Sequence, residues 1–402
     1  MDTDLLAALR TPAGRELLAA AEACLRTGAD GLQQAADLRR RNPSAPPDLA
    51  AAASTVAGLR QSAVAKLGSD AACLWATREA LEQATRRTVA EHRARRLARV
   101  APGARLVDLG CGLGADLIAA ARAGLHVTGV DSDPLRVALA AANLAELSLD
   151  GLVVQAAAEE VDVGAYDLAF TDPARRSGRG RISDPRDCSP GWDVVTRWLD
   201  GAVSGGAVVK TTPTIAHSLV PEGVETEWVS DGGDLVEAAL WGRPLATVRR
   251  RATVLPAGVT LTDRDDPGAG TVGVAAPGAY LFEPDDAVLR AGLVTAVAAQ
   301  LGGWLLDPHI AYLSGDHLVR TPYARAYRVL EEVPFHERAL RAALAARDIG
   351  TLTIKKRGVD VVPERLRARL RLRGGAVATI VLSRVAGAGR AYLVEPVSSR
   401  SG

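Results

Sequence analysis

The chain contains few of the residues that mark secreted, metal-binding or membrane-spanning proteins. Its four cysteines and six histidines lack the spacing of a disulfide framework or a zinc site. No apolar run is long enough to cross a bilayer, and the first residues have neither the basic nor the apolar segment of a signal peptide. We therefore expect a cytoplasmic protein with reduced thiols, no membrane segment and no metal site.

The net charge is also small, and lysine is scarce. The formal net charge is +1 over 402 residues, so only local basic patches could bind a nucleic acid. Of the 48 lysine and arginine residues, four are lysine: Lys66, Lys210, Lys355 and Lys356. We attribute this bias, together with the excess of alanine and glycine, to genomic base composition. The length is sufficient for two or three domains with their own cores.

The most informative segment is a glycine-rich loop between two short apolar strands. Residues 106–114 read LVDLGCGLG, and a second strand, 126–130, ends at Asp131. A helix over 115–123 fits between them, with Gly124 as its stop. The order strand, loop, helix, strand predicts a ligand that approaches the loop backbone closely. Asp131, at the tip of the second strand, suits the two hydroxyls of a ribose.

The spacing of the glycines separates two kinds of ligand. A dinucleotide loop needs G-x-G-x-x-G, so that a helix N-terminus faces a pyrophosphate, whereas this loop has G-x-G-x-G. Asp108, two residues before the first glycine, would repel a pyrophosphate and attract a positive group such as the amino group of S-adenosylmethionine. The pattern resembles the first motif of class I methyltransferases, and Asp131 resembles the ribose-binding acid of that family. We expect these residues to bind the cofactor: Asp108, Gly110, Cys111, Gly112, Gly114, Asp131 and Ser132.

Periodicity indicates a helical part followed by an α/β part. Residues 1–100 are rich in alanine and leucine and predict helices, including 48–66 and 76–100. An arginine run in the last of these predicts a solvated helix face, although a stripe facing RNA would have the same composition. Residues 101–245 alternate strand and helix, which indicates a parallel, doubly wound sheet closed by an antiparallel hairpin at 231–234.

The rest of the chain changes character twice. Residues 246–330 predict an extended connector that includes a hairpin pair within 245–262 and a helix over 287–301. Residues 331–402 predict a small α+β domain. Its helices and strands are expected at 336–347, 350–356, 363–372, 376–384 and 390–395.

A candidate substrate motif, Asp172-Pro173-Ala174-Arg175, follows the strand that ends at Thr171. The fourth strand of a class I methyltransferase presents its substrate motif at this place. Enzymes of that family that methylate base nitrogens often have Asp or Asn, then Pro-Pro, then an aromatic residue there. This chain lacks the aromatic residue, so Arg175 is the candidate to stack on a base or bind a phosphate. We predict Asp172, Pro173 and Arg175 as the catalytic residues.

Two basic clusters are candidates for RNA binding. One follows the substrate motif and includes Arg176 and Arg179 in a glycine-containing loop, a composition that suits an anionic polymer and also any exposed loop. The other spans residues 355–373, where eight basic residues stand against two acidic ones, a net charge of +6. Its predicted RNA-binding residues are Lys355, Lys356 and Arg357.

Together these motifs resemble a bacterial family of class I S-adenosylmethionine-dependent methyltransferases with a helical N-terminal region and a C-terminal THUMP-like domain. The segments that carry the resemblance are 77–84, 108–114, 131–134, 172–175, 280–284 and 354–358. The resemblance implies a Rossmann-like α/β sheet, S-adenosylmethionine as cofactor and an RNA substrate, because THUMP domains bind RNA, chiefly tRNA. We therefore expect an enzyme that methylates a base nitrogen in RNA, with tRNA as the leading candidate.

Two other functions stay open at this point. The departures from the family pattern at Ala156 and Ala174 allow an RNA-binding protein whose methyltransferase fold is catalytically idle. The intact glycine loop and Asp131 argue against that interpretation. A methyltransferase of small molecules is disfavoured by the basic C-terminal part. The target nucleotide does not follow from the fold, because one fold serves many substrates.

Overall fold

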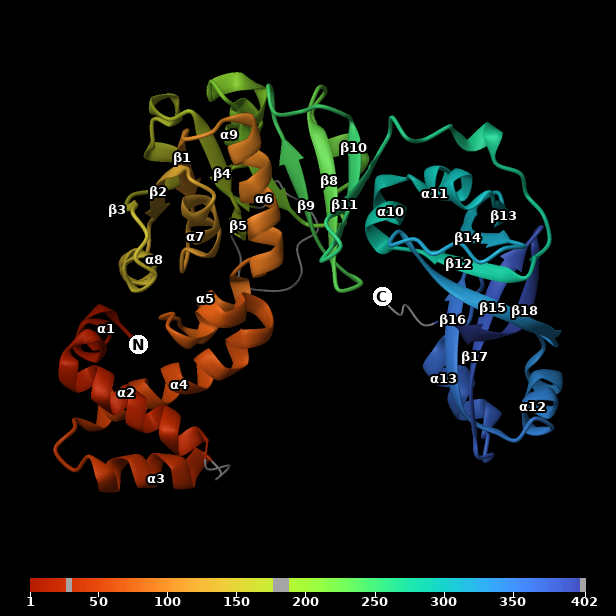
Figure 1. Cartoon of the computed structure of the whole chain (residues 1–402), viewed down its shortest axis with the longest axis horizontal. Coiled ribbons are helices and arrows are strands. Elements are labelled where there is room, and N and C mark those ends of the chain that lie inside the picture. The colour runs from red at the N-terminus through yellow and green to blue at the C-terminus, as the bar shows by residue number, and fades with distance from the viewer. Residues whose placement is uncertain (27–30, 176–187, 398–402) are drawn as a thin grey trace. The chain divides into compact units, whose positions relative to one another are not determined.

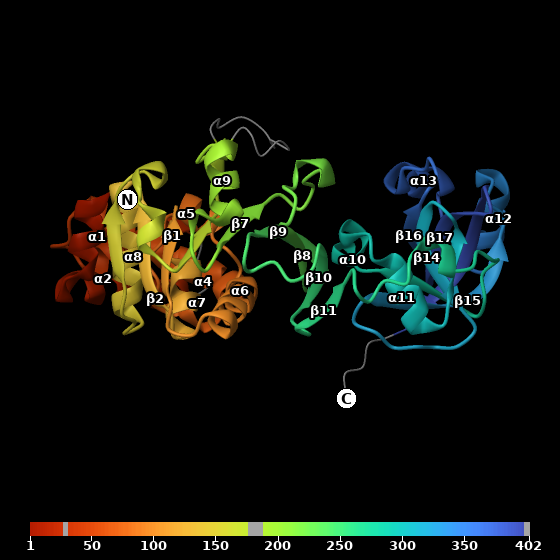
Figure 2. The same cartoon turned by 90° about the horizontal axis from the view of Figure 1, so that it is seen from above.

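The structure is a computed structural model that describes residues 1–26, 31–175 and 188–397 (Figures 1 and 2). It divides into two compact units, Met1–Glu225 with Ala238–Thr247, and Thr226–Glu237 with Val248–Gly402. No helix of the described part is long and apolar enough to cross a membrane. Those residues also contain no group of three or more His, Cys, Asp or Glu side chains that could hold a metal ion. None of the four cysteines forms a disulfide.

The first hundred residues are helical, as predicted. Asp2 caps the first helix by accepting a hydrogen bond from Leu5 N at 2.9 Å. Thr11 caps the second in the same way, with Pro12 in its first turn. The helices are α1 (Thr3–Arg10), α2 (Pro12–Leu25), α3 (Gly31–Arg41), α4 (Pro47–Leu67), α5 (Arg78–Gln83) and α6 (Arg87–Val100).

The single helix expected over 76–100 is wrong, because α5 ends at Gln83 and α6 begins only at Arg87. No proline or glycine interrupts the sequence between them. Thr85 is instead 5% exposed, and its hydroxyl accepts a hydrogen bond from Lys210 Nζ at 3.3 Å. A tertiary contact therefore determines where α5 and α6 are separated, and helix propensity, which depends on the local sequence, does not predict this position.

Two arginines of α6 correct the prediction of a solvated face. The Arg93 guanidinium lies 4.3 Å from the centroid of the Phe170 ring, and the Arg96 guanidinium lies 3.7 Å from the Trp241 ring. Arg96 also pairs with Glu225 at 2.7 Å, and the side chains of the two arginines are 4% and 14% exposed. These cation–π contacts attach α6 (Figure 1) to the core, so neither arginine can face RNA.

The first unit contains the predicted doubly wound sheet. Strands β3, β2, β1, β4 and β7 are parallel in this order, and β9 pairs antiparallel with β7. The chain order reverses between β1 and β4, which is where ligands bind in open α/β sheets. The elements described from residue 105 to residue 241 are β1 (Arg105–Leu109), α7 (Ala115–Arg122), β2 (His126–Asp131), α8 (Pro134–Glu146), β3 (Leu152–Gln155), β4 (Leu168–Thr171), β5 (Ala174–Arg175), β6 (Cys188–Ser189), α9 (Trp192–Arg197), β7 (Ala207–Thr211), β8 (Glu225–Asp231) and β9 (Asp234–Trp241).

The hairpin expected at 231–234 is confirmed. Strands β8 and β9 meet at Gly232 and Gly233, whose φ angles of 64° and 90° favour glycine. In the second unit, β8 pairs parallel with β10 (Arg250–Leu255), which pairs antiparallel with β11 (Val259–Thr262). The extended pair expected within 245–262 is therefore present.

The second unit also contains a seven-stranded sheet in the order β13-β14-β12-β15-β18-β17-β16. Strand β15 runs through residue 330, so the expected boundary between the connector and the α+β domain falls inside a strand. The helix expected over 287–301 is broken at Gly292, whose φ is 66°. The elements are β12 (Tyr280–Pro284), α10 (Asp286–Ala291), α11 (Val294–Leu301), β13 (Trp304–Asp307), β14 (Ile310–Gly315), β15 (Ala324–Val333), α12 (Glu337–Ala345), β16 (Ile349–Arg357), α13 (Pro363–Leu370), β17 (Ala376–Val385) and β18 (Ala388–Pro396).

This sheet has an apolar core on each face. On one face, leucines of α12 and α13 such as Leu340 and Leu370 pack against β16, β17 and β18, and Figure 2 shows both helices on the same side of the sheet. The other face holds a separate cluster that includes Tyr312 and Tyr327. A Cβ on Gly358 would lie 2.0 Å from Ile310 Cδ1, so the end of β16 passes close to β14. The sheet is therefore rolled.

Candidate active site

The glycine loop lies between β1 and α7. The φ angles of Gly110, Gly112 and Gly114 are +89°, +58° and +89°, a region that other residues rarely adopt. A Cβ on Gly112 would meet no other atom within 4 Å, whereas one on Gly114 would touch Ala140 at 3.4 Å. The loop is therefore packed on α8 at Gly114 and open at Gly112.

The backbone N–H groups of the loop bond to the protein itself. Gly110 N and Cys111 N both donate to Val130 O, at 2.8 and 2.9 Å. Gly112 N donates to Asp131 Oδ2 at 3.0 Å. A pyrophosphate-binding loop would keep such donors for its ligand. The structure thus favours the non-dinucleotide interpretation of the glycine spacing.

Asp131 lies at the end of β2 and is 5% exposed. Its Oδ1 accepts a hydrogen bond from Asp133 N at 3.0 Å, while Oδ2 accepts the one from Gly112 N. These bonds fix the carboxylate, and each oxygen keeps a lone pair because an ionised carboxylate accepts about four hydrogen bonds. Asp131 can therefore still accept two hydroxyls of a ribose. Ser132 follows it on the exposed side of the strand end.

Asn143 of α8 fixes the position of the glycine loop through hydrogen bonds. It is fully buried, and its Nδ2 donates to Leu113 O at 2.8 Å and to Trp75 O at 2.9 Å. Its Oδ1 accepts from Trp75 N at 2.7 Å. One amide thus ties the glycine loop to the helical N-terminal region. The sequence alone does not reveal this residue, because an asparagine inside an apolar helix carries no motif.

Asp108 lies in a cluster of acidic side chains beneath the loop. It is 2% exposed, and burial raises its pKa well above the ordinary value. Asp116, Asp172 and Asp131 raise the pKa further, while Arg93 opposes them. Such a cluster fits a ligand with a positive end, because a cation placed nearby would stabilise the ionised carboxylates. S-adenosylmethionine, with its sulfonium and ammonium groups, satisfies this requirement.

Cys111 takes no part in chemistry that needs a thiolate. Its side chain is 7% exposed, and burial, followed by the charges of Asp108 and Asp131, raises the pKa of its thiol. A Cβ on Gly129 would come within 3.0 Å of the sulfur, so the thiol packs against β2. Cys111 therefore contributes its backbone and its packing to the loop.

The end of β4 borders the glycine loop on the other side of the candidate site. Thr171 Oγ1 donates to Leu109 O at 2.8 Å and so joins the ends of β4 and β1. Asp172 follows, and its main-chain oxygen lies 3.8 Å from where a Cβ on Gly110 would be. The structure therefore places Asp172 beside the glycine loop, as the sequence motif predicts. Pro173 is half-buried next to it.

Lys210, at the end of β7, is the main residue that the sequence analysis missed on this side. Its Nζ lies 2.5 Å from Asp172 Oδ2, and the two side chains are 17% and 37% exposed. The same Nζ donates to Thr85, so a residue between α5 and α6 in the N-terminal region helps to hold the pair. The scarcity of lysine could have drawn attention to it.

A second scarce lysine lies near this pair. Lys66 Nζ donates to the main-chain oxygens of Leu81 and Glu82, at 2.8 and 2.6 Å. Burial, together with the positive charges of Lys210 and Arg86, lowers its pKa from 10.5 to about 8. The segment 77–84, which carries part of the family resemblance, contains α5. The main-chain oxygens near the C-terminal end of this helix are the ones that accept hydrogen bonds from Lys66.

For three arginines that the sequence predicts as functional, the structure describes little or nothing. Arg175 belongs to β5, which pairs antiparallel with β6, and its side chain is outside the description. Arg176 and Arg179 lie outside the described residues. Their roles stay predictions.

The predicted RNA-binding trio of β16 does not form one surface. Successive side chains of a strand point to opposite faces, so Lys355 and Arg357 share one face and Lys356 lies on the other. Lys355 Nζ bonds to Glu283 Oε2 at 3.1 Å, and the Arg357 guanidinium lies 5.5 Å from the Tyr312 ring. Segments 280–284 and 354–358 thus meet inside the rolled sheet. Of the three residues, only Lys356 is exposed.

Comparisons with known proteins identify the families that match parts of this chain. A methyltransferase domain family matches residues 106–173, a THUMP domain-like family matches 324–396, and a domain family of unknown function matches 2–63. A solved structure of a candidate methyltransferase from Porphyromonas gingivalis W83 has a TM-score of 0.76 at 21% identity, covering 94% of this chain and 98% of that chain, which supports the fold.

The relatives identified by sequence similarity show the family to which the chain belongs. Uncharacterised S-adenosylmethionine-dependent methyltransferases from two strains of Mycobacterium tuberculosis are 41% identical to the chain over 331 residues. The match covers 80% of this chain and 88% of each relative. The chain therefore belongs to the S-adenosylmethionine-dependent methyltransferases, with a THUMP-like domain at its C-terminal end.

Proposed function

We propose that this enzyme methylates a nitrogen of a nucleobase in RNA, with tRNA as the leading candidate. The observation that carries the proposal is the position of Asp172. It follows β4 at the point where the strand order reverses, beside the glycine loop, and Lys210 holds one of its carboxylate oxygens. A carboxylate and a neighbouring main-chain oxygen are suited to accept hydrogen bonds from an N–H group.

The residues of the chain then have separate tasks. S-adenosylmethionine supplies an activated methyl group, so the protein mainly aligns donor and acceptor. Asp131 holds the ribose of the cofactor, and Asp108 with its acidic neighbours faces the positive end. Asp172 accepts a hydrogen bond from the acceptor nitrogen and turns its lone pair toward the methyl group. Lys210 and Thr85 keep the Asp172 carboxylate in position.

The second unit supports RNA over a small molecule as the substrate. Residues 355–373 carry a net charge of +6, and the THUMP domain-like match spans 324–396. Clustered Arg and Lys side chains are what binding to a phosphate backbone requires. In this proposal Lys356 and the arginines within 365–373 contact phosphates, whereas Lys355 and Arg357 stabilise the rolled sheet.

The direct test is a methyl-transfer assay. The protein is incubated with labelled S-adenosylmethionine and total RNA, the RNA is digested, and the modified nucleoside is identified by mass spectrometry. We expect label in one base. Asp172→Ala should keep the affinity for the cofactor and lose the transfer. Label that appears only in small molecules of a cell extract would refute the RNA substrate.

A salt titration tests the phosphate contacts. Lys356→Ala should weaken binding to many RNAs alike. It should also reduce the slope of log K against log salt concentration by about 0.7, the value for one phosphate contact to a single strand. Lys355→Ala is the matched comparison, because its side chain is paired with Glu283. If both variants changed the slope equally, the division of the trio between two faces would have no functional meaning.

A further inference from the structure

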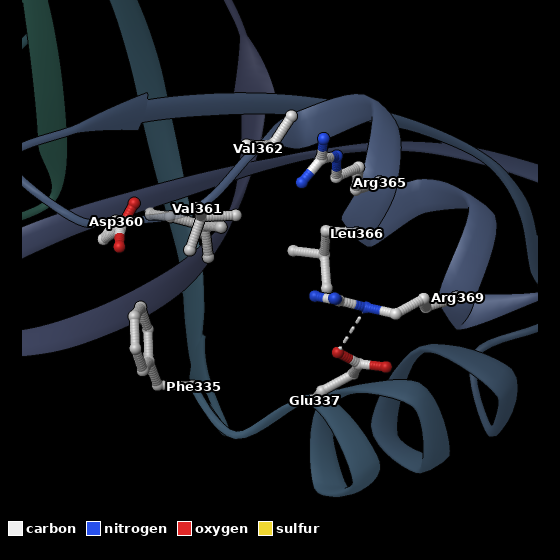
Figure 3. Close-up of a pocket in the computed structure, with 9 residues that line it drawn as sticks. Phe335, Glu337, Asp360, Val361, Val362, Arg365, Leu366 and Arg369 are labelled. Carbon is white, nitrogen blue, oxygen red and sulfur yellow. Dashed lines mark ion pairs between the residues drawn. The ribbon is translucent and has the colours of Figure 1, made fainter.

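The second unit contains a pocket that methyl transfer does not require. It has a volume of about 220 Å³ and lies between α12, α13 and the sheet (Figure 3). Its floor is apolar and includes Leu366 and Leu382, which are 5% and 1% exposed. The volume exceeds that of one water, about 30 Å³, and is below the roughly 300 Å³ of sites for drug-sized ligands. The pocket therefore fits one ring-sized group.

Two flat groups border the pocket from opposite sides. Figure 3 shows the Phe335 ring on one side and the Arg369 guanidinium on the other. The ring is held in place, because a Cβ on Gly389 would lie only 2.8 Å from its Cζ. Glu337 Oε2 lies 2.8 Å from Arg369 Nε, but the two side chains are 41% and 60% exposed, so the pair is weak and can open. Aromatic rings and guanidinium planes are the groups on which unpaired bases stack.

Polar groups stand at the rim of the pocket. Asp360 is exposed at one edge and can accept a hydrogen bond from an amino or imino group of a base. Arg365 is exposed at another edge and has no ion-pair partner within the described residues. Lys356 is the register partner of Leu382 in the parallel pair of β16 and β17, so its side chain lies on the face of the sheet that carries the pocket.

The charge around the pocket selects the kind of occupant. The segment 355–373 supplies most of the lining, and without Lys355 and Arg357, which lie on the other face of the sheet, it has six basic and two acidic residues. An apolar slot in a strongly basic surface suits a polyanion with a flat apolar side group, which describes single-stranded nucleic acid. A peptide would be attracted only if it were strongly acidic.

We propose that this pocket binds one unpaired base of the RNA substrate between Phe335 and Arg369, while Lys356 and Arg365 hold the adjacent phosphates. The proposal rests on the proposed function in that it takes RNA as the substrate. It adds a second recognition point, in the second unit, for an unpaired nucleotide. Base binding there needs no methyl transfer, so it can be measured separately.

The experiment uses the full chain saturated with S-adenosylhomocysteine, so that nucleotides cannot occupy the cofactor site. Binding of AMP, GMP, CMP and UMP is compared with that of ribose 5-phosphate by ligand-observed NMR. At least one mononucleotide should bind about fivefold to a hundredfold more tightly than ribose 5-phosphate, the range that one stacked base contributes. Phe335→Leu should abolish this difference.

Exposed variants guard against misfolding. Arg365→Gln, at the exposed rim of the pocket, should weaken the binding of the mononucleotide and of ribose 5-phosphate alike. The control is Arg341→Gln on the exposed face of α12, which should change neither. Equal affinity for mononucleotides and ribose 5-phosphate, or full affinity in Phe335→Leu, would overturn the base pocket. Methyl transfer to RNA by the wild-type protein would then still leave the proposed function standing.

Discussion

Removing the Asn143 amide should destabilise the first unit more than any other single truncation near the site. Asn143→Ala leaves three buried main-chain groups without their partner, namely Trp75 N–H, Trp75 C=O and Leu113 C=O. An unsatisfied buried group costs about 1–3 kcal/mol, so the loss of unfolding free energy should be roughly 3–5 kcal/mol. Because Leu113 belongs to the glycine loop, the affinity for the cofactor should fall as well.

Urea unfolding followed by tryptophan fluorescence measures this loss. S-adenosylhomocysteine stabilises only the unit that binds it, so the transition that shifts with the ligand reports the first unit. Asn42→Ala is the matched control, because the Asn42 side chain is half-buried and makes one hydrogen bond, to Leu38 O at 3.1 Å. A loss below about 1 kcal/mol for Asn143→Ala, with unchanged cofactor affinity, would refute the argument.

Three further outcomes follow from the site. Asp131→Ala should weaken S-adenosylmethionine binding in calorimetry by roughly 1.5–3 kcal/mol, and unchanged affinity would move the ribose contact elsewhere. Lys210→Met should lower kcat without changing the affinity for the cofactor, and Lys210→Arg should retain part of the wild-type kcat. Normal turnover in Lys210→Met would show that Lys210 has no role in the reaction. Burial, with the charges of Lys210 and Arg86, lowers the pKa of Lys66 to about 8 from 10.5. The unfolded chain then binds more protons between these values, so the stability of the wild type relative to Lys66→Met should rise as the pH increases from about 8 to about 10.5. A difference that stays constant over this range would contradict the lowered pKa.

The arrangement of the glycine loop and Asp131 could be predicted because these residues are close together in the chain. The glycine spacing, the helix after it and the acid at the next strand end all lie within 106–131. Loop backbone angles depend on local residues, and parallel strands bring their carboxyl ends to one edge. Asp172 was predictable for the same reason, since it directly follows a strand of that sheet.

The acceptor side and the second unit needed the tertiary structure. Thr85 meets Lys210 across 125 residues, Lys355 meets Glu283 across 72, and Asn143 meets Trp75 across 68. The periodicity of hydrophobic residues does not predict such pairs, because it indicates only which face of a helix or strand is apolar.

The same physics explains the wrong predictions. A run of arginines specifies charge, but whether each one meets water, an aromatic ring or a carboxylate depends on what packs against the helix. The sequence by itself therefore determined the glycine loop, the acidic residue at the end of β2 and the sheet that presents them. Only the tertiary structure decided that Arg93 and Arg96 are buried, that Lys210 holds Asp172 and that the trio of β16 is divided, because these contacts join elements distant in the chain.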